Sequence, residues 1–226
     1  MESLNLPNWA VILILFGCAF VVIQTSEIMN KRGVAIDLSR KVAHVMTGMV
    51  FVLTPFLTNN VWPGLIVFGL FVIINFIIWY TGSFEGMSDE NESNLGGVWF
   101  ALAAVVCAYF LWDYPPLMIA AFMPLTWGDA AASVIGRRLG RNKYAVFGNT
   151  RSYEGSAALF VFAFIAVLLA LFLVPGQPIL ALGAALGAAG ILALGSMLLE
   201  SVSVWGLDNL FITAFSIIVM LQYVPA

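Results

Sequence analysis

Eight separate apolar runs constrain this chain more than any other feature of its sequence. Each run is bounded by Pro, Gly, Asn or a charged residue, and together they cover 9–23, 42–57, 61–80, 96–112, 116–136, 156–174, 178–198 and 208–224. A spanning helix needs about 20 mostly apolar residues, so eight of them would use about 160 positions. The sequence therefore predicts an all-α, polytopic membrane bundle of about eight helices, forming one catalytic domain over residues 1–226.

The composition excludes a water-soluble fold. Of the 226 residues, 62% are hydrophobic and 9% charged, whereas an average soluble domain has about 25% charged residues. The formal net charge of −3 is too small to indicate a nucleic-acid partner. The first apolar run has no basic segment before it, because Lys31 and Arg32 follow it. We therefore expect a retained helix there and not a signal peptide.

The connections between the runs are of two kinds. Three are short (58–60, 113–115 and 175–178) and carry one charge, Asp113. The others (24–41, 81–95, 137–155 and 199–208) hold all nine basic residues, and ten of the twelve acids lie in them or at helix ends opening on them. By the positive-inside rule the second set is cytoplasmic. The sequence thus predicts an integral protein of the cell (plasma or inner) membrane, with both termini outside and the polar chemistry facing the cytoplasm.

The densest polar segment runs from Gly128 to Ser156. Asp129 ends an apolar run, where an unpaired carboxylate is costly, so we expect it to meet a metal ion or a cation, the alternative being a structural ion pair. Cations that can bind a polyphosphate follow it: Arg137, Arg138, Arg141, Lys143 and Arg151. Ser152 suits a helix N-cap before Glu154 and Gly155, and the free N–H groups of a helix start attract anions.

Polar side chains gather in three further places. Arg40 and Lys41 precede His44 by four and three residues, which places them on one helical face; the ordinary alternative for His44 is a helix-packing histidine bonded to a carbonyl. Glu200, Asp208 and Asn209 flank the last polar connection and offer the hard oxygen ligands that Mg²⁺ accepts. Residues 85–94 form an acidic stretch that by itself predicts a solvated loop.

These residues, in this order, resemble the membrane-bound polyprenol kinase family, which includes dolichol, phytol and farnesol kinases and is related to CTP:phosphatidate cytidylyltransferase. The family's R-K-x-x-H is matched by Arg40, Lys41 and His44, and its late D-N by Asp208 and Asn209. Its G-D-x-x-A-x-x-x-G-x-x-x-G is matched by Gly128, Asp129, Ala132, Gly136 and Gly140, and its K-[ST]-x-E-G-S by Arg151, Ser152, Glu154, Gly155 and Ser156. Arg151 stands where Lys is usual, a change that preserves a phosphate contact.

The resemblance implies phosphoryl transfer from a nucleotide, typically CTP, to the hydroxyl of a membrane lipid alcohol such as phytol, geranylgeraniol, a polyprenol or dolichol. It implies Asp129, His44 and Lys41 as catalytic residues, and Arg40 with the basic segment and residues 151–155 as the nucleotide site. Asp129, Glu200, Asp208 and Asn209 would hold Mg²⁺. The alternatives are a CDP-lipid synthase, whose longer late signature is missing after Glu200, and a small transporter or scaffold, which would not need Asp129 beside so many cations.

Overall fold

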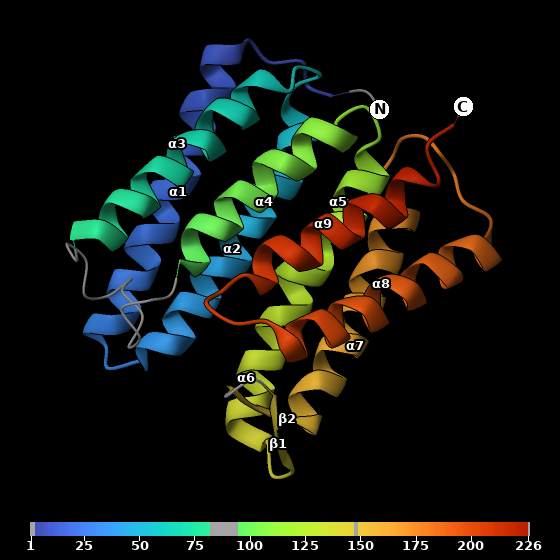
Figure 1. Cartoon of the computed structure of the whole chain (residues 1–226). Coiled ribbons are helices and arrows are strands. Elements are labelled where there is room, and N and C mark those ends of the chain that lie inside the picture. Colours follow the sequence, from blue (N-terminus) through green and yellow to red (C-terminus); the bar gives the residue numbers. More distant parts are fainter. Residues whose placement is uncertain (1–2, 82–94, 147–148, 226) are drawn as a thin grey trace.

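The computed structural model describes residues 3–81, 95–146 and 149–225, and most of these residues are helical. The helices are α1 (Asn8–Lys31), α2 (Ile36–Leu57), α3 (Trp62–Thr81), α4 (Gly96–Leu111), α5 (Pro115–Met123), α6 (Ala130–Leu139), α7 (Tyr153–Leu173), α8 (Leu182–Val202) and α9 (Asp208–Leu221). A π-helical segment, η1 (Pro124–Asp129), joins α5 to α6 without a break. Each of the eight predicted apolar runs therefore corresponds to one helical rod, meaning a single helix or the continuous unit of α5, η1 and α6 (Figure 1).

The rods have the lengths that a membrane protein needs. Five of them (α1, α3, α5 to α6, α7 and α8) are long and apolar enough to cross a bilayer, and α4 and α9 are shorter apolar helices. The second rod, α2, has 22 residues and carries Asp37, Arg40, Lys41 and His44 in its first turns. The predicted all-α membrane bundle is confirmed.

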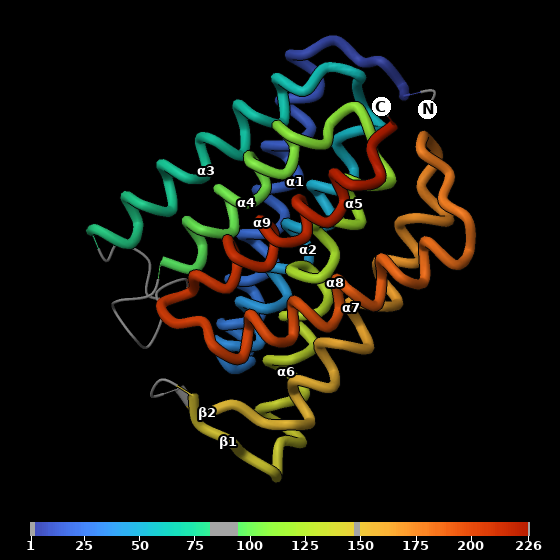
Figure 2. Tube along the Cα trace, turned by 45° about the vertical axis from the view of Figure 1, so that its right-hand side comes forward, coloured from blue at the N-terminus to red at the C-terminus, as the bar shows by residue number. Residues whose placement is uncertain are grey.

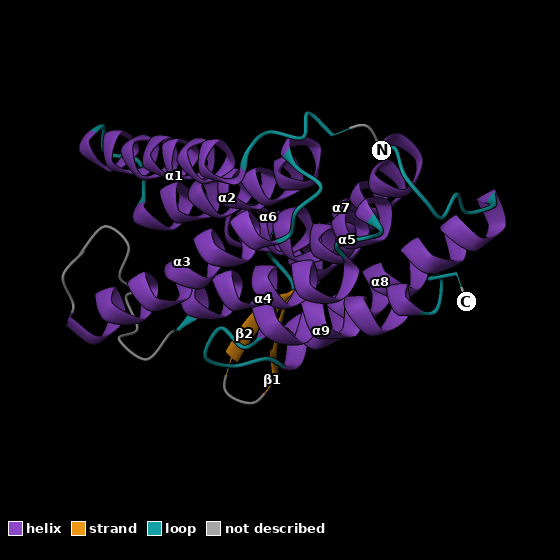
Figure 3. Cartoon of the chain, turned by 90° about the horizontal axis from the view of Figure 1, so that it is seen from above, coloured by secondary structure: helices purple, strands orange, loops and turns teal. Residues whose placement is uncertain are grey.

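The centre of the bundle is α5. Every residue from Pro116 to Met123 is buried, which is expected of a helix that is apolar on all sides and surrounded by others. It packs against α7, α9, α4 and α2, and Figure 3 shows it between α1 and α2 on one side and α4 and α9 on the other. In contrast, α1 and α3 expose large apolar side chains such as Phe20 and Ile73, as helices facing lipid do.

The two kinds of connection lie at opposite ends of the bundle. The short connections after α2, α4 and α7 lie at the same end as both chain termini (Figures 1 and 2). The turn between α1 and α2, the segment after α6 and the connection from α8 to α9 lie at the other end, which we call the polar end. The acidic stretch at 85–94 lies outside the described residues.

A small antiparallel hairpin at the polar end was not predicted from the sequence. Its strands are β1 (Lys143–Val146) and β2 (Asn149–Ser152), and Lys143 pairs with Ser152. The hydroxyl of Tyr144 lies 2.7 Å from the hydroxyl of Ser156, which attaches the hairpin to the first turn of α7. Four-residue strands have too few positions for an alternating pattern to be read reliably, so the sequence predicts only a polar connection here.

Candidate active site

An ion pair between α2 and the central rod forms the core of the candidate site. Nζ of Lys41 donates to Oδ2 of Asp129 at 2.6 Å. Nε2 of His44 lies 3.7 Å from the same carboxylate oxygen and 3.0 Å from the carbonyl oxygen of Leu125. Because a carbonyl oxygen only accepts, Nε2 must carry the proton, so Nδ1 is the ring nitrogen that can accept one.

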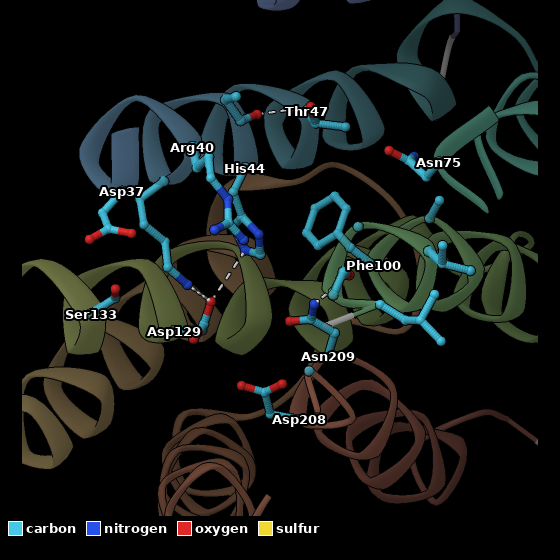
Figure 4. A pocket seen from close by; sticks show the side chains of 18 of the residues that line it. Asp37, Arg40, His44, Thr47, Asn75, Phe100, Asp129, Ser133, Asp208 and Asn209 are labelled. Atoms are coloured by element: carbon cyan, nitrogen blue, oxygen red, sulfur yellow. Dashed lines mark hydrogen bonds and ion pairs between the residues drawn. The ribbon is translucent and has the colours of Figure 1, made fainter. Parts of the chain in front are cut away.

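The π-helical segment brings Asp129 into this position. Pi-helical turns insert an extra residue into a helix and occur frequently at functional sites. Here η1 ends at Asp129, which is 5% exposed. Figure 4 shows its carboxylate pointing toward His44, with Phe100 beside the imidazole ring; the His44 and Phe100 ring centres are 4.2 Å apart. A buried carboxylate needs a positive partner, and Lys41 supplies it.

The last two helices add oxygen donors on the opposite side of Asp129. The carboxylates of Asp129 and Asp208 face the same space in Figure 4. Asn209 donates from Nδ2 to the carbonyl oxygen of Gly96 at 2.7 Å, which commits its nitrogen and leaves Oδ1 as a possible ligand. Glu200 is 6% exposed, and its Oε1 lies 3.1 Å from Nε of Arg151. Glu200, Asp208 and Asp129 are close enough to interact electrostatically.

Close packing of α6 against α7 holds the second group of predicted residues. A Cβ on Gly155 would lie 2.9 Å from the carbonyl oxygen of Ala132, and a Cβ on Gly140 would lie 2.6 Å from Oγ of Ser152. Glycine is therefore required at both positions. The predicted N-cap is confirmed, because the N–H of Gly155 donates to Oγ of Ser152 at 3.1 Å. This cap starts α7 directly beside the candidate site.

A single large cavity of about 2060 Å³ connects these groups to an apolar region. At the polar end its lining includes most of the predicted residues: Arg40, Lys41, His44, Asp129, Arg137, Lys143, Arg151, Ser152, Gly155, Glu200, Asp208 and Asn209. Its lining also includes apolar side chains of α1 and α3, among them Phe16, Phe20, Phe71, Ile74 and Ile78. The cavity thus has a charged part and an apolar part.

Three predicted nucleotide-binding residues do not line this cavity: Arg138, Arg141 and Glu154. The carboxylate of Glu154 instead accepts from the backbone N–H of Asn142 at 3.1 Å and from its side-chain Nδ2 at 2.9 Å. Glu154 therefore fastens the start of the hairpin to α7. Conversely, the sequence did not predict Asp37 as a site residue, although it lines the cavity and pairs with Arg137. Its position just before Arg40, Lys41 and His44 is the sequence feature that could have indicated it.

The oxygen donors suit a magnesium ion that arrives with phosphate. In the described part of the chain, no three His, Cys, Asp or Glu side chains come together as a ready metal cluster. Magnesium, however, is usually bound through one or two carboxylates with the rest of its shell from water and substrate phosphates. Asp129 and Asp208, with Oδ1 of Asn209 nearby, match that smaller requirement.

The chain is similar to several curated phytol kinases. It is 27% identical over 213 residues to a phytol kinase of Synechocystis sp., covering 92% of this chain and 89% of that protein. It is 31% identical over 134 residues to a probable chloroplastic phytol kinase 3 of Glycine max, covering 54% of this chain and 42% of that protein. Phytol kinase 1 of Arabidopsis thaliana is 26% identical over 163 residues, covering 66% and 53%.

No family model matches the chain, and no solved structure matches it. The ordered motifs lie in segments that line the cavity. Similarity to a phytol kinase over nearly the whole chain confirms the resemblance, drawn from those motifs, to the family of phytol and related polyprenol kinases.

Proposed function

We propose that this protein is a lipid-alcohol kinase that transfers the γ-phosphoryl group of CTP to the terminal hydroxyl of an isoprenoid alcohol. Similarity to phytol kinases supports the lipid-alcohol kinase class. The observation that carries the proposal is the single cavity in which the Lys41, His44 and Asp129 cluster meets an apolar lining from α1 and α3. A long apolar alcohol and a charged nucleotide require both surfaces within one site.

The apolar part of the cavity would hold the alcohol's tail. Its lining by Phe16, Phe20, Phe71 and Ile74 comes from α1 and α3, the helices whose outer faces are also apolar. A tail in this position can enter sideways from the bilayer without crossing the charged part. Its hydroxyl would then point toward His44, whose Nδ1 can accept the proton.

The charged part would hold the nucleotide's phosphates. Arg40, Arg137, Lys143 and Arg151 come from α2, α6, β1 and β2, and all four line the cavity. Lys41 would exchange part of its contact with Asp129 for the γ-phosphate. Phosphoryl transfer needs little covalent chemistry from the protein, so positioning and charge neutralisation account for most of the catalysis.

Magnesium, when bound, would neutralise phosphate charge. Asp129 and Asp208 would hold it, with Asn209 and Glu200 in supporting positions. This assignment explains why four acidic or amide side chains are kept at the edge of apolar helices, where each is costly unless it is paired or ligated. The resident residues orient the two substrates and exclude water from the reacting hydroxyl.

The polar end of the bundle would face the cytoplasm, with both termini outside the cell membrane, because all nine basic residues lie in the connections at that end or in the helix turns next to them. A soluble nucleotide can reach the cavity from that side.

The direct test of the proposal is product identification. Purified protein in detergent or vesicles would be incubated with phytol, geranylgeraniol, a long polyprenol and diacylglycerol, each with a labelled nucleotide and Mg²⁺. We expect an isoprenoid monophosphate with CTP as the preferred donor. Phosphorylation of diacylglycerol alone, or of no alcohol, would contradict the proposal.

A further inference from the structure

The connection between α8 and α9 contains a turn with an unexpected residue. The N–H of Leu207 donates to the carbonyl oxygen of Val204 at 3.1 Å, and the two residues between them have positive φ angles, 56° at Trp205 and 73° at Gly206. Positive φ at both central positions is the pattern of a type I′ turn. Asn, Asp or Gly normally occupies the first of them, and a bulky side chain there is an outlier.

The strained residue lies in the wall of the main cavity. Trp205 is 67% exposed, although it belongs to the largest apolar side chains of the protein. It lines both the main cavity and a small side pocket formed with Leu95, Trp99 and Leu207. Within residues 95–146 and 149–225, no aromatic ring pairs with the indole. Strained backbone that displays a side chain in this way is concentrated at ligand sites.

The turn also has a defined place relative to the phosphate-binding groups. It lies between Glu200 and Asp208, both of which line the cavity. Trp205 lines the same cavity as Arg151 and Lys143, so a ligand whose phosphates are held by these cations beside the carboxylates can meet Trp205 with its other end. The face of the indole ring is flat and apolar. It can therefore stack against a nucleobase, which is the planar part of a nucleotide.

We propose that the indole of Trp205 is the stacking platform for the base of the donor nucleotide. This inference rests on the proposed function and adds the base subsite to it. Stacking on an aromatic face tolerates every base, so Trp205 would supply affinity for a nucleoside and not the choice of CTP. The type I′ turn would hold Trp205 at the cavity before the ligand arrives, which lowers the entropy cost of binding.

An ordinary alternative is that Trp205 anchors the protein at the membrane surface, where Trp is enriched. The chain provides a matched control for this alternative. Trp9 is also 67% exposed and lies at the opposite end, at the start of α1. A general anchoring role would make the two tryptophans equivalent, whereas a base subsite would involve Trp205 alone.

The experiment compares Trp205→Leu, Trp205→Phe and Trp9→Leu in full-length protein. Leu and Phe both keep a branched side chain on the turn, but only Phe keeps a ring. Equilibrium binding of labelled CTP and competition by inorganic tripolyphosphate, which has no base, are measured without turnover. The KM values for nucleotide and alcohol are measured in parallel.

We expect Trp205→Leu to weaken CTP binding about 5- to 100-fold, the loss that removal of one stacked ring commonly causes. Affinity for tripolyphosphate and the KM for the alcohol should stay unchanged, and Trp205→Phe and Trp9→Leu should resemble the wild type. Unchanged CTP binding in Trp205→Leu, or a parallel loss for tripolyphosphate, would overturn the base subsite. Failure of the wild type to phosphorylate any alcohol while it binds CTP would count against the proposed function alone.

Discussion

Nζ of Lys41 lies 2.6 Å from Oδ2 of Asp129, although 88 positions separate the two residues in the chain. The pair joins the first turns of α2 to the end of η1, so it brings the early and central motifs of the sequence into one site. The side chain of Asp129 is only 7% exposed and that of Lys41 is 25% exposed. The contact therefore has consequences for both stability and catalysis.

Replacement of Asp129 by Asn should abolish most turnover while the protein stays folded. The change keeps the size of the side chain and removes the charge that faces Lys41 and the candidate metal position. Loss of one preorganised electrostatic contact commonly costs about 10²–10³ in rate. Steady-state kinetics would measure it, with Asp113→Asn at the opposite, exposed end as the control. Near-normal turnover in Asp129→Asn would show that Asp129 has only a structural role.

Replacement of Lys41 by Met should destabilise the protein as well as inactivate it. It leaves the buried Asp129 carboxylate without its partner, a loss of about 1–3 kcal/mol for a buried polar group. The control is Lys31→Met, which breaks the exposed pair of Lys31 with Glu27 at 2.6 Å, with side chains 72% and 50% exposed. Exposed pairs contribute about 1 kcal/mol or less. Thermal unfolding in detergent should therefore separate the two variants, and equal melting temperatures would contradict this account.

His44→Ala should reduce turnover less than Asp129→Asn. Its Nε2 is held by the Leu125 carbonyl, so the ring is well placed to accept a proton through Nδ1, yet positioning and charge account for most of phosphoryl transfer. We expect a loss of about 10²-fold or less, with the KM for CTP nearly unchanged. A larger loss than that of Asp129→Asn would reverse the order of importance proposed here.

Gly155→Ala should disturb the junction of α6 and α7. The new Cβ would lie 2.9 Å from the Ala132 carbonyl oxygen, and such overpacking commonly costs about 1–3 kcal/mol. Gly187→Ala is the matched control on α8, because nothing lies within 4 Å of a Cβ there. Unfolding temperature and CTP affinity should fall only in Gly155→Ala. A fall of similar size in both variants would show that the close approach of Gly155 to Ala132 is not the cause.

The orientation in the membrane can be tested by labelling single cysteines. After replacement of Cys18 and Cys107, cysteine would be placed at 31, 143, 59 or 177, all of which are exposed in the structure. An impermeant reagent on intact cells should modify 59 and 177 but spare 31 and 143. The reverse pattern would place the polar end outside and remove the proposed access for cytoplasmic nucleotide.

Local features of this fold could be predicted from the sequence, and distant pairings could not. The cap of Ser152 on the N–H of Gly155 spans three residues, and its pattern is visible in the chain. The pairing of Glu154 with Asn142 across the hairpin and that of Arg137 with Asp37 depend on how separate segments pack. The family motif assigned Glu154 to the nucleotide site, and its bonds to Asn142 could not be foreseen from that motif.

The lining of the cavity could likewise not be predicted from the composition of the helices. Apolar runs predict where helices lie, but they do not tell which apolar faces meet lipid and which line an internal space. Phe20 is 62% exposed and also lines the cavity, so hydropathy alone could not assign it to a substrate surface. The role of Trp205 was likewise hidden, because its turn depends on backbone angles that a Trp-Gly pair does not ordinarily predict.

The transfer of label from CTP tests the central claim most directly. A kinase passes the γ-phosphoryl group to an alcohol and releases CDP, whereas a CDP-lipid synthase joins the α-phosphorus to a lipid phosphate and releases pyrophosphate. Purified protein would be given an isoprenoid alcohol and, separately, phosphatidate, with CTP labelled at either phosphorus. We predict γ-label in the lipid fraction with the alcohol and no α-label with either lipid. Incorporation of α-label from phosphatidate without phosphorylation of the alcohol would contradict the kinase assignment.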